Sequence, residues 1–253
     1  MNIEQAVAEI RNVEEVPGLP MAWRWSPMSR FLFSLAMDAD GGWAYQMNSL
    51  DVHDEGLSRE RDFMDGQIWD ALVDSVKNAC TAGLEQGAVP RPVIMPLVGG
   101  ELVGMVWARP FTTSEDALTG IAQLSTIAAA AGADEIVLAW ETADVAAACG
   151  LPAVGPAPCL NLVRAGRDGH VLHRFPYTEN VVARGPDGTA SVVPDWLPAL
   201  APQPGGDLVA PVQAAVTYSF IPLELDHPNP FGVTVVLMEE DGYKVRLAET
   251  FAH

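Results

Sequence analysis

Hydrophobic and polar residues alternate in two stretches near the start of the chain, and this period of two is typical of β-strands. The apolar positions, separated by turn-forming residues 38–42, are Phe31, Phe33, Leu35, Met37, Trp43, Tyr45 and Met47. They predict a β-hairpin. A second hairpin is predicted over residues 93–107, with Gly99-Gly100 as its two-residue turn. Pro92 and Pro96 place its first strand at a sheet edge, because proline cannot donate a ladder hydrogen bond.

Other segments show the spacing of helices. Residues 2–13 predict a short amphipathic helix, and residues 58–86 predict a long helix with an apolar stripe on one side and acidic residues on the other. Residues 114–131 are apolar on nearly every side, so they predict a buried helix, capped by Thr113 or Ser114 and ended by Gly132. Residues 144–149 predict a fourth helix.

Strands are predicted for most of the remaining chain. The unbroken apolar run Ile136–Trp140 predicts a central strand covered on both faces. Beyond Pro158 the pattern is rich in strands and proposed hairpin turns, with apolar runs at Leu160–Val163, Val171–Phe175, Val233–Met238 and Val245–Leu247. The Pro- and Gly-rich residues 198–211 predict a linker or a long surface excursion.

The order of these elements predicts the fold class. We expect an α/β protein, with α+β as the alternative, in which hairpin–helix units surround a mixed sheet and the C-terminal third is rich in strands. The order hairpin, helix, strand, helix implies at least one parallel crossover. The 253 residues fit a single compact domain over 1–253, and sub-boundaries would fall at 87–92 and 198–211.

The charge of the chain restricts its partners. It has 14 Lys and Arg against 33 Asp and Glu, a formal charge of −19, which opposes direct binding to nucleic acid and to anionic membranes. This charge suits a basic protein partner or a neighbouring subunit of an oligomer. Residues 38–74 hold ten of the acids, and we expect an acidic interaction surface there that includes Asp62, Asp65, Asp70 and Asp74.

The sequence also predicts a compartment. The opening residues MNIEQAVAEIRNVEE carry acids where a secretory signal needs positive charge, and no apolar stretch is long enough to span a bilayer. Three cysteines without a CxxC pairing fit reduced thiols. We therefore expect a soluble, cytoplasmic protein.

Motifs for metals and nucleotides are weak or missing. Residues 51–56 resemble a calcium loop poorly, and His170 and His173 are three apart on a predicted strand, so they would point to opposite faces. The chain has no GxSxG, GxxxxGK[ST] or GxGxxG sequence. We expect no metal and no cofactor.

The remaining candidates support three functions. Trp23 and Trp25, on either side of Arg24, are candidate interface anchors for a non-catalytic interaction or assembly protein, which is the expected function. The first alternative is a small-molecule hydrolase or transferase with its pocket at the end of strand 136–140. Its weak catalytic candidates are Glu141, Asp144, Cys159 and His173, with Thr142 at the mouth.

The second alternative is an acidic decoy or inhibitor of a nucleic-acid-binding protein. Shape separates these functions. A deep pocket with convergent polar groups favours the enzyme, whereas a flat apolar patch or an acidic ridge favours interaction.

Overall fold

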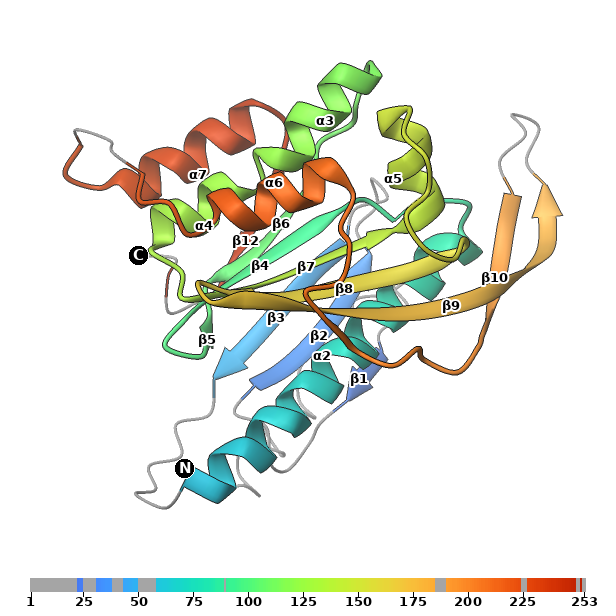
Figure 1. Ribbon diagram of the computed structural model, residues 1–253, viewed down its shortest axis with the longest axis horizontal. Helices are drawn as coiled ribbons and strands as arrows, with labels where there is room; N and C mark the ends of the chain where they lie inside the picture. The colour runs from blue at the N-terminus through green and yellow to red at the C-terminus, as the bar shows by residue number, and fades with distance from the viewer. Residues whose placement is uncertain are drawn as a thin grey trace.

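The computed structural model describes residues 22–24, 31–37, 43–49, 58–88, 90–184, 190–223, 227–248 and 251, with side chains from Trp69 onward. These residues form a small sheet, a large sheet and six helices (Figure 1). The described part is a mixed α/β structure with a strand-rich C-terminal portion, as expected. The helix predicted over residues 2–13 lies outside the described residues.

The small sheet is antiparallel and has three strands. Its strands follow the order β1 (Ala22–Arg24), β2 (Phe31–Met37) and β3 (Trp43–Ser49). Strands β2 and β3 pair from Phe31↔Ser49 to Met37↔Trp43, which confirms the first predicted hairpin. Its turn, residues 38–42, lies outside the described residues.

The large sheet has nine strands. They are β4 (Val93–Val98), β5 (Glu101–Leu102), β6 (Gly104–Trp107), β7 (Glu135–Glu141), β8 (Cys159–Gly166), β9 (Gly169–Arg184), β10 (Ala190–Trp196), β11 (Gln203–Pro204) and β12 (Lys244–Leu247). The main path runs β10-β9-β8-β7-β4-β6-β12, while β5 pairs with β4 and β11 pairs with β9.

Every pair of neighbouring strands in the described sheets is antiparallel. The expected crossover exists between β6 and β7, which run in the same direction because each is antiparallel to β4. Strand β4 lies between them, so the crossover creates no parallel pair.

Helices cover both faces of the large sheet. Figure 1 shows one face covered by α3 (Ser114–Ala122), α4 (Ser125–Ala131), α5 (Thr142–Cys149), α6 (Ala210–Tyr218) and α7 (Pro230–Glu240). The long helix α2 (Ser58–Glu85) packs on the opposite face. This arrangement forms two cores, one on each side of the sheet.

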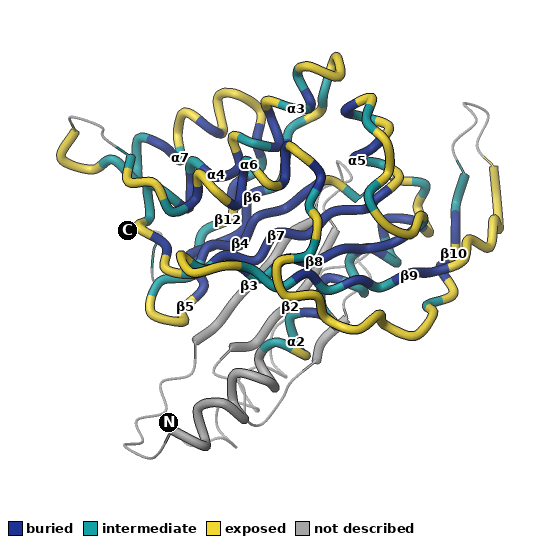
Figure 2. Tube along the Cα trace, viewed as in Figure 1, coloured by how far each residue is buried: buried dark blue, intermediate teal, exposed yellow. Residues whose placement is uncertain are grey.

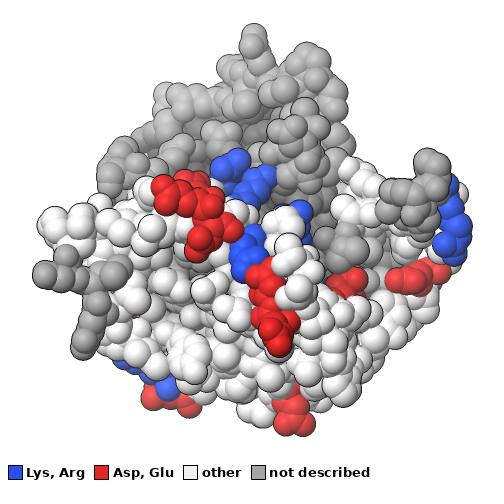
Figure 3. All heavy atoms as spheres, turned by 90° about the horizontal axis from the view of Figure 1, so that it is seen from above, with Lys and Arg blue, Asp and Glu red and all other residues white. Residues whose placement is uncertain are grey.

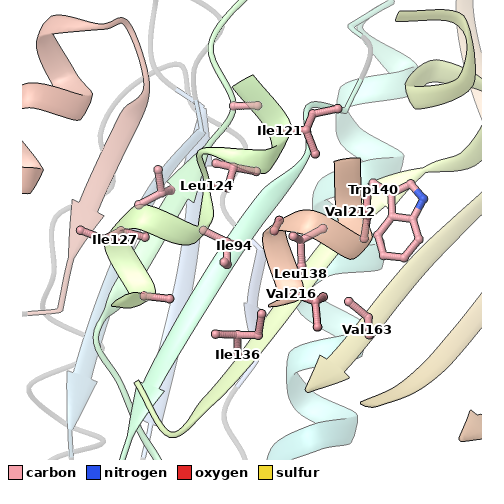
Figure 4. Packing of buried hydrophobic residues seen from close by; sticks show 14 of the residues in the cluster. Ile94, Ile121, Leu124, Ile127, Ile136, Leu138, Trp140, Val163, Val212 and Val216 are labelled. Atoms are coloured by element: carbon pink, nitrogen blue, oxygen red, sulfur yellow. The ribbon is translucent and has the colours of Figure 1, made fainter. Parts of the chain in front are cut away.

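Successive residues of the central strands enter different cores, and this explains their unbroken apolar runs. In β7, Ile136, Leu138 and Trp140 face α3, α4 and α6, as Figure 4 shows. Val137 and Ala139 belong to the other core, together with Val73, Val76 and Cys80 of α2. The buried centre of the sheet is visible in Figure 2.

The second predicted hairpin is confirmed, but its first strand is not at an edge. Strand β4 pairs with β7 on one side and with β5 and β6 on the other. The Pro96 carbonyl accepts a hydrogen bond from Val103 N at 2.9 Å, where β5 and β6 are interrupted. In an antiparallel strand, the nitrogen and the carbonyl of one residue face the same neighbouring strand. The nitrogen of Pro96 therefore faces β5 and β6, and its missing N–H removes no hydrogen bond to β7.

Two further predictions need correction. Residues 114–131 form two helices rather than one, because the chain turns at Gln123-Leu124 between α3 and α4. Residues Val233–Met238 were expected as a strand but belong to α7. Asn229 caps this helix through a side-chain hydrogen bond from Gly232 N, and Pro230 occupies its first turn, which favours a helix over the β propensity of the valines.

Candidate functional site

A pocket of about 680 Å³ lies at one end of the large sheet, where β7 ends and β4 begins. Its walls come from α2, the segment 88–93, the segment 107–111, the end of β7 and α5. The apolar lining includes Val76, Val93, Trp107, Ala139, Trp140, Val145, Ala148 and Leu160. This volume lies in the range of pockets that bind small organic molecules.

Four charged residues line this pocket among the described residues. Three are basic, Arg91, Arg109 and Lys244, and one is acidic, Asp144. The Arg109 guanidinium forms an ion pair with Asp116, whose Oδ2 lies 2.9 Å from Nη1, and it also stacks over the Tyr243 ring. Figure 3 shows Lys and Arg side chains gathered between groups of Asp and Glu on the face seen from above. The pocket is thus more basic than the chain as a whole.

The junction between β7 and α5 places Asp144 at the pocket. Glu141 ends β7 and caps α5, because its Oε2 accepts a hydrogen bond from Asp144 N at 2.7 Å. Its Oε1 accepts a second bond from Cys159 N at 2.8 Å, and only 2% of the residue is exposed. Glu141 is therefore a fixed, buried carboxyl behind the pocket and does not line it, contrary to expectation.

The surroundings of these two carboxyls change their proton affinity. Burial, together with the nearby Glu141 and Glu179 carboxylates, raises the pKa of Asp144 to about 7. Burial also raises the pKa of Glu141, although its hydrogen bonds from backbone N–H groups oppose that change. Since a carboxyl that titrates near neutral pH can donate and accept protons there, Asp144 is suited to acid–base chemistry.

Thr142 has a structural contact in place of the expected position at the mouth of the pocket. It is buried, and its Oγ1 lies 2.7 Å from Asn161 Nδ2 and 3.3 Å from the Cys159 carbonyl. These bonds tie the start of α5 to β8.

Cys159 and His173 do not form a catalytic pair. In β8 and β9, Cys159 lies opposite Pro176 and His173 lies opposite Leu162, so strand alternation directs the two side chains to opposite faces. Cys159 is fully buried, and burial raises the pKa of its thiol to about 11, which keeps it protonated. The His173 ring packs against the Trp69 ring with 4.5 Å between their centroids.

The proposed interaction residues are only partly described. Asp70 and Asp74 are exposed on α2, beside its buried stripe of Val73, Val76 and Cys80. The side chains of Asp62 and Asp65 lie outside the described residues. Trp23 belongs to β1, with only its backbone described, and Trp25 is outside the described residues. An acidic surface on this helix stays a prediction.

Sequence reasoning missed the basic residues of the pocket. Arg91 and Arg109 each precede a proline next to a strand end, and Lys244 begins β12. Only the pairing of Trp107 with both Val93 and Lys244 brings these three segments together. The sequence offered only a basic residue next to a proline near the end of a strand, and this combination is common on protein surfaces.

The described residues contain neither a metal site nor a membrane span. No group of three or more His, Cys, Asp or Glu residues in the described part of the chain could hold a metal ion. No described helix is long and apolar enough to cross a bilayer. Comparison with protein-family models, curated protein sequences and solved structures finds no match to this chain.

Proposed function

We propose that the protein binds a small organic molecule, with an apolar body and an anionic group, in the pocket at the end of β7. The single observation that carries this proposal is a pocket of about 680 Å³ with apolar walls and a mainly basic set of charged residues. The chain as a whole has a formal charge of −19, so the charged lining of this pocket is opposite in sign to the rest of the chain. This proposal corresponds to the small-molecule alternative, and the concavity separates it from a flat interaction surface.

The ligand's two parts follow from the lining. Aromatic and aliphatic side chains, such as Trp107, Trp140 and Leu160, would bury an apolar body. Arg91 and Lys244 would attract an anionic group, since a cation near an apolar wall interacts with charge more strongly than one in water. Asp144 would oppose an anion only when it is ionised.

An anilinonaphthalene sulfonate dye tests this proposal, because it combines an apolar ring system with a sulfonate. We expect the dye to fluoresce on binding and to quench Trp107 and Trp140. Ala148→Trp places a large ring in the pocket and should weaken dye binding at least tenfold. Ala147→Trp is the matched control, since Ala147 is exposed on the same helix and does not line the pocket.

Charge reversal provides a second test of the same site. Arg91→Glu should weaken the sulfonate dye but not a neutral dye of similar shape, because only the sulfonate is repelled. If Ala148→Trp and Ala147→Trp bind the dye equally well, the pocket is not its binding site and the proposal is wrong.

A contact with a neighbouring subunit, a second copy of this chain, is the second proposed function. The observation that favours it is the arm formed by the far end of β9 and β10, which extends from the sheet in Figure 1. Val181, Val182 and Val193 on this arm are 46%, 62% and 37% exposed. Replacing Val182 with lysine should abolish any concentration-dependent association seen by light scattering, and unchanged association would exclude the arm.

A further inference from the structure

Asp144 has no acidic neighbour in the pocket lining, but it lies beside acidic groups behind that lining. Of the described side chains that line the pocket, only Asp144 is acidic. The carboxylates of Glu141, at the end of β7, and of Glu179, on β9, both act on it. The Cys80 thiol of α2 and the Tyr177 hydroxyl of β9 are further ionisable groups near this cluster. Burial raises the pKa of both, so they stay neutral around pH 7.

The hydrogen bonds decide which of the two adjacent carboxyls holds a proton. Both Glu141 oxygens accept bonds from backbone N–H groups, and these donors favour its charged form. The Asp144 backbone donates one of those bonds, and Asp144, unlike Glu141, is among the residues that line the pocket. The proton therefore belongs on Asp144, next to any bound molecule.

The cations of the pocket do not cancel this arrangement. Arg109 is held by Asp116, which also accepts a bond from Thr112 N at 2.8 Å. Arg91 and Lys244 enter from the segment after α2 and from β12, and the forces on the Asp144 carboxyl come from burial and from acidic groups. No described cation of the pocket is among the groups that shift the proton affinity of Asp144.

We propose that Asp144 is the acid–base residue of this pocket and exchanges its proton with a basic oxygen or nitrogen atom of the bound organic anion. The inference rests on the proposed binding function. In the step, the O–H bond of Asp144 breaks, and its proton forms a new bond with the ligand atom. The ligand atom supplies the electron pair of this bond. Asp144 is left as a carboxylate, the ligand loses one negative charge, and the reverse step restores both. No electrons are transferred to an acceptor.

Esterification by a diazoacetate ester tests this inference, because diazo compounds react with protonated carboxyls. The carboxyl proton moves to the diazo carbon, the carboxylate oxygen forms a bond to that carbon, and N₂ leaves. Peptide mass spectrometry then identifies the modified residue. We expect Asp144 to be labelled at about pH 6 more strongly than exposed acids such as Asp70, and its labelling to fall more than tenfold by about pH 8.5.

Variants and a second measurement make the test specific. Asp144→Asn should lose the label and also lose a carbonyl stretch of protonated carboxyl from the infrared spectrum at the same pH. Bound dye should protect Asp144 in the parent protein and in Ala147→Trp. Ala148→Trp should be labelled weakly because its pocket is filled.

The outcomes separate this inference from the binding function. If the sulfonate dye binds in the pocket but Asp144 is no more labelled than Asp70, the acid–base role is wrong and binding stands. An infrared spectrum that does not change in Asp144→Asn leads to the same conclusion. If the dye does not bind in the pocket, the binding function fails, and the acid–base role fails with it.

Discussion

Replacing Asp144 with asparagine should stabilise the protein at neutral to alkaline pH and leave its stability in acid unchanged. Burial and nearby carboxylates raise the pKa of Asp144 from 3.8 to about 7 in the folded protein. Between these values the folded protein holds a proton that the unfolded chain has released, so its free energy of unfolding falls as the pH rises. The loss is complete above about pH 7, and asparagine, which does not ionise, removes it.

The magnitude follows from the two pKa values. They differ by about 3, from 3.8 to about 7, and each pKa unit corresponds to about 1.4 kcal/mol. The upper value is thus about 4 kcal/mol, and because water that reaches the pocket screens the charges, we expect about 2 kcal/mol. The bond from Asp144 N to Glu141 survives the change, since it uses the backbone.

Urea denaturation between about pH 4 and pH 8.5 measures this difference, with Asp70→Asn as control. Asp70 is exposed on α2, so its replacement should leave the pH dependence close to that of the parent protein. If the curves for Asp144→Asn and the parent protein stay parallel across the range, Asp144 carries no raised pKa. The argument from burial would then be refuted.

Three other predictions concern the sheet and the surface. Leu138→Ala, at a fully buried position of β7, should lower the free energy of unfolding by about 2–5 kcal/mol in urea, while the 41% exposed Leu200→Ala should change it little. Gly104→Ala would place a Cβ 2.9 Å from Leu247 Cα and push β6 away from β12. This should lower the free energy of unfolding by about 1–3 kcal/mol and speed amide exchange in β12. Unchanged exchange would show that the strands tolerate a side chain here. Replacing Asp62, Asp65, Asp70 and Asp74 with asparagine should weaken capture of a basic partner and its salt dependence, and an unchanged salt response would show that the acids serve only solvation.

Features encoded by neighbouring residues could be predicted from the sequence. The Gly99-Gly100 turn has φ values of 59° and 80°, a left-handed conformation that glycine adopts without strain, and its place in the sequence was sufficient to identify it. Thr113 caps α3 by accepting a bond from Asp116 N, as the spacing suggested. Strand β7 followed from its unbroken apolar run.

Features that depend on distant pairing could not be predicted in this way. Pro96 can lie in the central strand β4 because the neighbouring strands β5 and β6 are interrupted at Val103. No local sequence pattern reveals that interruption. The pocket is similar, since Arg91, Arg109 and Lys244 meet only through pairing of three strands. Asp144 was among the predicted candidates. The burial and the carboxylates that raise its pKa come from segments far apart in the sequence, so the sequence did not show this shift.

The pairing of β6 with β12 has a consequence for protein synthesis. Gly104 pairs with Leu247, so the edge of β6 stays without this partner until the ribosome has made most of the chain. Meanwhile β4, β7, β8 and β9 can already assemble, because they are close in sequence. The nascent chain therefore presents a growing sheet with an uncovered edge, which is the kind of surface that chaperones shield from other chains.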